Sequence, residues 1–360
     1  MPKTIKNKFD ENLTYDKLME AHKKSRKGKG YRNEVIEFNL KQEEYILWLY
    51  NSLKNQTYKH GGYKVFYITE PKLRKIEKSR YIDRIVHRWI VDNFLEPYYV
   101  PTFINTSYAC LKNRGMHKAA IDVQSMMIKA KNKWQEYYVL KMDISKYFDS
   151  INKNILFCIL KRKIKDKKLI WLINEILFSQ KREKGLEIRK LYISNVWKYL
   201  FKWARPICKT KTTYKILCEV SLDDSVIIVE TKEEAKNVLK EITKFLDENL
   251  GLKLNKKTQI FKGKQGVNFC GYKINEYRMK LRDKGKRKLK KKVKKLTNQV
   301  YDGKISSKEA KKYLAGHMGY IKYADTYNLV NKLLFLENPQ IVWGFGKASA
   351  MSRQKTPFNI

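Results

Sequence analysis

The chain has 360 residues, of which 43% are hydrophobic and 13% aromatic, so it is too apolar for a disordered tail and long enough for two or three domains or one elaborated enzyme. Its 78 Lys and Arg outnumber its 36 Asp and Glu, which gives a net charge of +42. Because such self-repulsion destabilises a compact chain, we expect a polyanion to neutralise it, and a phosphate backbone is the most common one. The composition therefore indicates a nucleic-acid partner.

Other classes of protein are disfavoured by what the sequence lacks. The five cysteines are dispersed and form no C-x-x-C pair, so neither a disulfide framework nor a zinc site is indicated. No apolar run reaches the roughly 18 residues that would span a bilayer, and the opening Met-Pro-Lys-Thr-Ile-Lys lacks the apolar stretch of a secretory signal. We expect a cytoplasmic protein with no membrane partner.

The first elements are predicted from periodicity. Residues 1–60 are basic and mainly helical in pattern, with apolar side chains at helical spacing over 38–50. Residues 63–68 are rich in β-formers and are followed by Pro71, which predicts a strand. Apolar residues at helical spacing over 82–94 then predict a helix with one buried face.

Acidic residues end two of the predicted strands. A mostly apolar strand ends on Asp143, and two runs of β-formers at 215–220 and 225–229 predict a hairpin with Asp223 and Asp224 at its tip. Carboxylates at the ends of buried strands are costly unless a cation neutralises them, and Mg²⁺ prefers such oxygen ligands. The plain alternative is that the acidic pair is turn chemistry and that Asp143 is a cap.

Two helices are predicted in the last third of the chain. Thr231 caps the first, with Glu234 in the capping-box position, and Gly251 ends it. In the second, ten of the fourteen residues at 282–295 are Lys or Arg. Its thin apolar seam consists of Leu289, Val293 and Leu296. This segment is either a solvated surface helix or a helix that binds a nucleic-acid backbone, and the second is favoured because ten cations in about 21 Å repel strongly without a polyanion.

Several segments, taken in order, resemble the motifs of reverse transcriptases. Lys-Met-Asp-Ile-Ser-Lys-Tyr-Phe-Asp-Ser-Ile (141–151) and Ser-Leu-Asp-Asp (221–224) resemble the palm. Residues 70–76 and 81–87 resemble the fingers of bacterial group II intron-type and diversity-generating reverse transcriptases. Residues 254–260 are similar to the segment that carries the family's lysine, and residues 266–274 to its primer grip. Residues 316–329 resemble the thumb of the diversity-generating group. Together the ordered motifs are specific, although each alone is weak.

This resemblance implies an α+β right-hand polymerase with an antiparallel palm sheet. The implied domains are a basic helical N-terminal extension at 1–60, fingers at 61–135, a palm at 136–282 with a fingers insertion around 152–214, a helical thumb at 283–335 and a C-terminal tail at 336–360.

The resemblance also implies the catalytic residues. Asp143, Asp223 and Asp224, together with Ile144, would form the metal site for two Mg²⁺ ions, which Mn²⁺ could replace. Two such ions activate a 3′-hydroxyl and stabilise the leaving pyrophosphate. Lys257 matches the lysine that protonates this pyrophosphate, although the adjacent lysine is an equally suitable general acid.

Five residues are implied to bind the incoming nucleotide. Lys72 and Arg74 match the fingers residues that hold the triphosphate, with an ordinary solvated basic strand as the alternative. Phe148 matches the bulky residue that excludes a ribose 2′-hydroxyl, with core packing as its alternative. Glu187 and Arg189 replace the family's Pro and Gly where the chain packs on the nascent base pair, so we hypothesise restricted or unusual base selection.

Two further groups are implied to bind the primer and its duplex. The primer grip would consist of Phe269, Gly271 and Tyr272. The nucleic-acid-binding face of the basic helix would consist of Arg282, Lys286, Arg287, Lys290, Lys291 and Lys294.

The implied function is that of a reverse transcriptase-family DNA polymerase. Among bacterial relatives the chain most resembles the "unknown group" and defence-associated enzymes, which act in antiphage immunity. The expected partners are a non-coding RNA, nascent DNA, deoxynucleoside triphosphates, and further copies of the chain or a second protein subunit. One alternative is a diversity-generating or retron-like enzyme that copies a defined RNA, and another is a catalytically silent RNA-binding scaffold.

Overall fold

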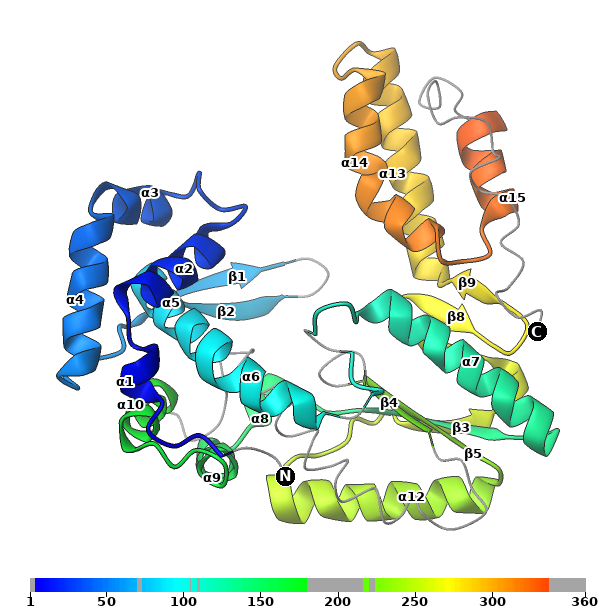
Figure 1. Ribbon diagram of the computed structural model, residues 1–360. Helices are drawn as coiled ribbons and strands as arrows, with labels where there is room; N and C mark the ends of the chain where they lie inside the picture. Colours follow the sequence, from blue (N-terminus) through cyan, green and yellow to red (C-terminus); the bar gives the residue numbers. More distant parts are fainter. Residues whose placement is uncertain are drawn as a thin grey trace. The chain divides into compact units, whose positions relative to one another are not determined.

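The computed structural model describes residues 4–69, 73–103, 105–108, 111–179, 216–219 and 224–336 (Figure 1). The chain divides into two compact units, and each is discontinuous in sequence. The first unit comprises Met1–Asn113, Met142–Thr212 and Asn237–Thr258. The second comprises Arg114–Lys141, Thr213–Lys236 and Gln259–Ile360. Strand β3 (Tyr138–Asp143) and helix α12 (Lys232–Phe245) run across the boundary between them.

The first unit is mainly helical. Its elements are α1 (Phe9–Asn12), α2 (Tyr15–Arg26), α3 (Asn33–Leu40), α4 (Gln42–Lys54), β1 (Tyr63–Ile68), β2 (Arg74–Ser79), α5 (Tyr81–Ile90), the π-helical turn η1 (Val91–Leu95), α6 (Glu96–Tyr99), η2 (Val100–Thr102), α8 (Tyr147–Ser150), α9 (Lys153–Lys161), α10 (Lys167–Leu177) and η3 (Leu246–Leu250).

The second unit combines strands with long helices. Its elements are α7 (Met116–Trp134), β4 (Ile216–Glu219), β5 (Asp224–Val229), β6 (Gln259–Lys262), η4 (Gly263–Gln265), β7 (Val267–Phe269), β8 (Tyr272–Ile274), β9 (Met279–Leu281), α13 (Asp283–Tyr301), α14 (Ser307–Ile321), α15 (Tyr327–Val330) and η5 (Asn331–Leu336).

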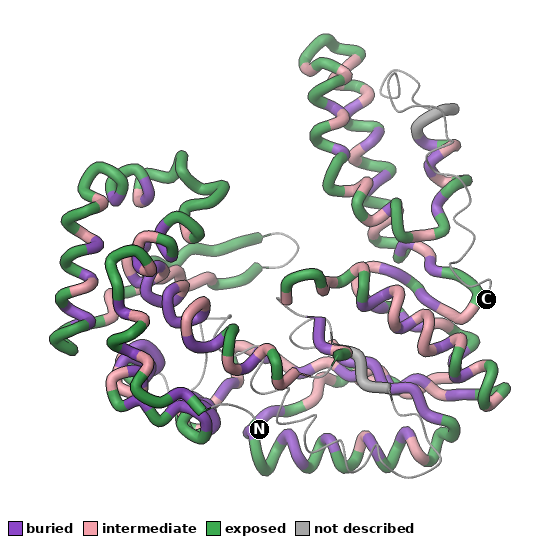
Figure 2. The backbone as a smooth tube through the Cα atoms, in the orientation of Figure 1, coloured by how far each residue is buried: buried purple, intermediate pink, exposed green. Residues whose placement is uncertain are grey.

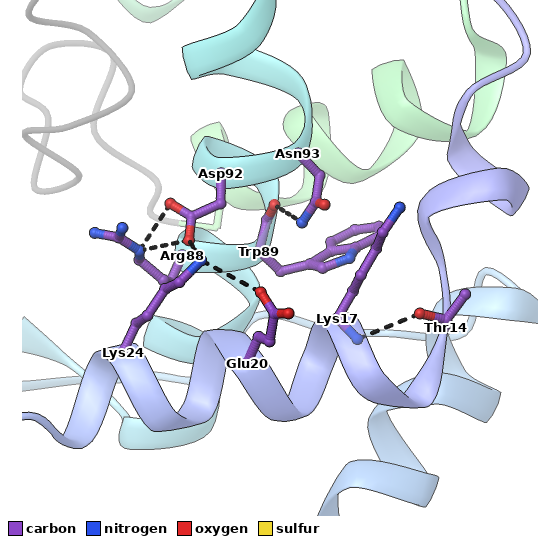
Figure 3. Close-up of polar contacts among 8 residues, drawn as sticks. All are labelled: Thr14, Lys17, Glu20, Lys24, Arg88, Trp89, Asp92 and Asn93. Atoms are coloured by element: carbon purple, nitrogen blue, oxygen red, sulfur yellow. Dashed lines mark hydrogen bonds and ion pairs between the residues drawn. The ribbon is translucent and has the colours of Figure 1, made fainter.

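The core of the first unit lies along α5, which packs against α2. Trp89 is fully buried, with the rings of Phe9 and Phe94 edge-on at 5.4 and 5.1 Å. At the surface of the same helix pair, Lys24 lies between Glu20 and Asp92, with Nζ 3.1 Å from the Asp92 carboxylate (Figure 3). The apolar core, and not this ion pair, supplies most of the stabilisation, because ion pairs at a protein surface contribute about 1 kcal/mol or less.

The strands of the second unit form two antiparallel groups. The sheet that positions the candidate site has the strand order β4-β5-β3-β6, and α7 packs on it through contacts with β4 and β5. The other sheet has the order β7-β8-β9. Gly263 follows β6 where no side chain fits, because a Cβ there would lie 2.1 Å from the ring of Tyr137.

The predicted elements agree well with the structure. Strand β1 has the predicted bounds, and among the described residues it pairs with β2 alone. Strand β1 is largely exposed, whereas most of β2 is half-buried (Figure 2). The hairpin of β4 and β5 is confirmed, although Asp224 lies within β5 and not in the turn. Thr231 accepts a hydrogen bond from the Glu234 backbone N–H, which confirms the predicted cap of α12. The α+β class is confirmed, and the fingers, palm and thumb boundaries stay predictions.

The helices of the second unit also agree with the sequence pattern. Helix α13 buries the predicted seam of Leu289, Val293 and Leu296. Across the described residues, no helix is both long and apolar enough to cross a membrane.

Candidate active site

Asp143 closes β3 and is bound by the segment that carries Lys257. The Asn255 side-chain amide donates to Asp143 Oδ2 at 2.9 Å, and the Asn255 backbone N–H donates to the Asp143 carbonyl at 2.7 Å. An isolated antiparallel bridge joins the next residues, Ile144 and Leu254. Because a hydrogen bond to a charged carboxylate is among the stronger ones, these contacts fix the orientation of the Asp143 side chain.

Asp224 begins β5, the neighbour of β3, and is paired with a lysine of that strand. Lys141 Nζ lies 3.6 Å from Asp224 Oδ1, and both side chains are partly exposed. Burial raises the pKa of the nearby Cys270 thiol to about 12, the Asp224 carboxylate adds to this rise, and Lys141 opposes it. The three groups therefore share one electrostatic environment. Because side chains alternate along a strand, Lys141 and Asp143 point to the same side of β3.

The donor types at these strands suit a hard divalent cation. Carboxylate oxygens are the ligands that Mg²⁺ and Mn²⁺ prefer, and an ammonium group already lies against Asp224. Ile144 has a buried side chain without a ligand atom, so only its backbone oxygen could bind a metal. Asp223 lies outside the described residues. Within the described ranges, no three His, Cys, Asp or Glu form a group that could hold a metal ion, so the ligand set stays a prediction.

Two of the five residues predicted to bind the nucleotide, Arg74 and Phe148, are described, and both lie in the first unit together with Lys257, the predicted general acid. Arg74 is exposed on β2, and Lys257 is exposed beyond α12. Phe148 is half-buried in α8, with its ring 5.3 Å from that of Tyr147 in an edge-on arrangement. The two cations are therefore accessible to a solvated anion. The other predicted nucleotide-binding residues lie outside the described residues: Lys72, Glu187 and Arg189.

The predicted primer grip is a tight hairpin between β7 and β8. Its two turn residues, Cys270 and Gly271, both have positive φ, at 48° and 89°, which is typical of a type I′ turn. Phe269 and Tyr272 are fully buried on either side of it. A Cβ at Gly271 would lie 2.9 Å from the ring of Tyr320, so the turn also packs closely on α14. Of the three predicted grip residues, only Gly271, in the turn, is not buried, because both flanking rings lie in the core.

The predicted nucleic-acid-binding helix presents its charges to solvent. Eight of the ten Lys and Arg over 282–295 are exposed. Arg287, Lys291 and Lys294 follow each other at intervals of four and three residues, on the side opposite the buried seam. Of the other predicted residues, Arg282 precedes the helix, Lys290 is exposed, and Lys286 is half-buried with its Nζ 3.4 Å from Asp283. Their role in binding stays a prediction.

Residues 68–274 match the family described as reverse transcriptase (RNA-dependent DNA polymerase). The chain belongs to this reverse transcriptase family. The match includes β3 and the primer-grip hairpin and ends before α13. No curated protein sequence matches the chain.

Solved structures that this reverse transcriptase-family chain matches include two yeast telomerases. One is apo telomerase from Candida tropicalis, truncated from its C-terminal domain, with 14% identity, a TM-score of 0.45, and coverage of 64% of this chain and 58% of that one. Another is telomerase from Candida albicans in complex with a fragment of telomeric RNA, with 11% identity, a TM-score of 0.46, and coverage of 70% and 54%. The chain thus spans little more than half the length of these structures.

Sequence reasoning missed two polar residues of this reverse transcriptase-family site. The position of Lys141 could have been predicted, because a residue two positions before Asp143 lies on the same side of the strand. Asn255 lies inside the segment recognised for its lysine, but its contact with Asp143 spans 112 positions of sequence. No local pattern predicts such a contact.

Proposed function

We propose that the chain is an RNA-directed DNA polymerase that adds deoxynucleotides to a 3′-hydroxyl. The observation that carries the proposal is the arrangement at β3. Its terminal Asp143 is bound by Asn255, while Lys141, on the same side of the strand, pairs with Asp224 of the neighbouring β5. Membership of the reverse transcriptase family supports the same reading.

We assign the cation ligands to Asp143, Asp223 and Asp224, which would hold two Mg²⁺ or Mn²⁺ ions. When bound, these ions neutralise charge on the 3′-oxygen and on the leaving pyrophosphate. The chain's own contribution is orientation. Asn255 fixes the Asp143 carboxylate, and Lys141 balances the charge of Asp224 before a cation arrives.

The remaining predicted residues would act on the nucleotide. In the reaction, the primer 3′-hydroxyl gives up its proton to solvent and its oxygen bonds to the α-phosphorus. The bond from this phosphorus to the bridging oxygen breaks, and the leaving pyrophosphate takes up a proton. Lys72 and Arg74 would hold the triphosphate, and the exposed Lys257 ammonium would supply the proton. Phe148 would contact the sugar and favour a deoxyribose.

We further propose a biological setting: a bacterial, cytoplasmic enzyme of antiphage defence that works with a non-coding RNA. The net charge of +42 and the exposed cations of α13 support an RNA partner. The charged residues at 187 and 189, in a segment that resembles the family's nucleotide pocket, support restricted base selection.

The test uses the full-length protein purified with its bound nucleic acid. Mg²⁺ and each labelled deoxynucleotide are supplied separately, and any product is sequenced. We expect extension by the wild type and none by Asp224→Asn, whereas Asp247→Asn, at an exposed acid of η3, keeps wild-type activity. The polymerase proposal would be refuted if the wild type incorporated none of the four nucleotides. It would also be refuted if Asp224→Asn incorporated nucleotides as well as the wild type.

The same experiment separates the finer proposals. Similar incorporation of all four nucleotides on a heteropolymer template would refute restricted base selection and leave the polymerase standing. A single complementary DNA of fixed length, copied from the bound RNA, would indicate a retron-like enzyme. If Asp223→Ala kept biological activity, the chain would be an RNA-binding scaffold.

A further inference from the structure

Three elements of the second unit meet at the hydroxyl of Tyr272. Tyr272 lies on β8, directly after the primer-grip turn, and its ring is fully buried. His117 Nδ1, from the N-terminal turn of α7, lies 2.7 Å from the hydroxyl, and the hydroxyl donates to the backbone carbonyl of Tyr320, near the end of α14, at 3.2 Å. The partners are 155 and 48 positions away in sequence, so these contacts are purely tertiary.

The direction of these hydrogen bonds follows from proton counting. A tyrosine hydroxyl has one proton, and Tyr272 gives it to the carbonyl of Tyr320. His117 must therefore donate from Nδ1–H to the Tyr272 oxygen. Burial lowers the pKa of His117 and raises that of Tyr272, so both groups stay neutral at physiological pH. A directed chain results, from α7 through β8 to α14.

Aromatic contacts reinforce this chain. The His117 ring stacks on Tyr323, with centroids 4.6 Å apart and planes at 15°, and meets the Tyr320 ring edge-on at 5.1 Å. The Tyr320 ring in turn contacts Gly271, and its hydroxyl donates to Met116 Sδ at 2.7 Å. His117, at the start of α7, thus packs against Tyr272, which directly follows the turn, and against Tyr320 and Tyr323 at and just beyond the end of α14.

We infer that His117 is a positioning residue, which sets where the turn of Cys270 and Gly271 lies against α14. The inference rests on the proposed function, because this turn holds Gly271, the one predicted primer-grip residue that is not buried. The Gly271 carbonyl also accepts from the Arg282 backbone N–H at 3.1 Å, so the same turn is tied to the start of α13. His117 touches no reacting atom. It acts on a nucleic-acid 3′ end only through the turn, so its loss should weaken primer binding and leave the chemical step nearly unchanged.

Four variants separate the hydrogen bond from simple packing. His117→Phe keeps a ring and removes the donor, and His117→Asn keeps a donor close to the position of Nδ1. Tyr272→Phe removes the central hydroxyl. Tyr277→Phe is the matched control, because this tyrosine lies in the turn between β8 and β9 and is 71% exposed.

Two readouts are measured on the full chain. In steady-state extension, His117→Phe and Tyr272→Phe are expected to raise KM for primer–template by about 2- to 10-fold, the range for one net hydrogen bond, with kcat within about twofold. The double variant should be no worse than either single one, and His117→Asn should recover most of the affinity. In nucleic-acid-free protein, amide exchange should rise both at the β7–β8 turn and at the end of α14.

The outcomes decide the inference. Unchanged KM in His117→Phe would overturn it, and so would an equal loss of kcat and thermal stability in His117→Phe and His117→Asn, which is the result of a purely structural role. If the wild type extends no primer, the proposed polymerase function fails, but amide exchange still tests the positioning. Faster exchange at both the turn and α14 would support it, and faster exchange confined to α7 would overturn it.

Discussion

The exposed cations of α13 allow a quantitative prediction of how the affinity for nucleic acid depends on salt concentration. Arg287, Lys291 and Lys294 lie on its solvent side, one or two helical turns apart, so they can reach successive phosphates of one backbone. The perturbation is to replace all three with Gln. Because all three side chains are exposed, the free energy of unfolding should change by only about 0.5 kcal/mol for each.

The magnitude follows from counterion release. Each phosphate that a duplex-binding protein neutralises contributes about 0.9 to the slope of log K against log salt, so loss of three contacts should reduce this slope by about 2.7. Between 50 and 200 mM salt, a change of this size corresponds to about 40-fold in affinity. The difference between wild type and variant should therefore be large at low salt and small at high salt.

The assay is fluorescence anisotropy of a labelled primer–template over a series of salt concentrations. The matched control replaces three exposed lysines of α12, Lys236, Lys240 and Lys244, which have similar helical spacing. It removes the same charge from a different helix and should keep the wild-type slope. An unchanged slope in the α13 variant, or equal reductions in both variants, would show that α13 makes no local phosphate contacts and that only net charge matters.

Three further outcomes follow from the candidate site. Asn255→Ala should lower single-turnover extension by about 10- to 100-fold, because a hydrogen bond to a charged carboxylate contributes about 1.5–3 kcal/mol; a loss below twofold would contradict its orienting role. Lys141→Gln removes an ammonium that would compete with a metal ion for Asp224. Half-maximal Mn²⁺ binding, measured by electron paramagnetic resonance, should therefore need about fivefold less Mn²⁺ in this variant, and weaker binding would contradict the competition. Burial raises the pKa of Cys270 to about 12, so about one Cys270 thiol in ten thousand is ionised at pH 8. In mass spectrometry, iodoacetamide should therefore modify the exposed Cys158 well before Cys270, and equal rates of modification would contradict the burial of Cys270.

Features that depend on neighbours in sequence were predicted well. Strand β1 has the predicted bounds because its β-formers are consecutive and a proline follows them. The buried seam of α13 was predicted from three apolar residues at helical spacing among cations. The cap of α12 by Thr231 follows from a hydrogen bond across three residues. In each case the deciding interaction lies within one element.

Features that depend on distant partners could not be predicted in this way. Asn255 and His117 acquire their roles only when pairing of strands and packing of helices bring them to Asp143 and Tyr272. The burial of Phe269 has the same origin, since a motif match assigns a segment to the primer grip without showing which of its side chains face the core. The family resemblance supplied the position of each motif, and only the contacts show how its residues are supported.

The two described aspartates of the candidate site differ in their neighbours, and this difference indicates different behaviour when a cation binds. An amide donor on Asp143 Oδ2 is neutral, so a cation bound to this carboxylate would not repel it. The ammonium of Lys141 carries the same sign of charge as a metal ion, so it must move from Asp224 or weaken the binding of that ion. Under the proposed ligand set, Asp143 would therefore be the fixed ligand and Asp224 the exchangeable one. In a chain with 36 Asp and Glu and 78 Lys and Arg, Lys141 also gives Asp224 a defined partner that a bound cation would have to displace.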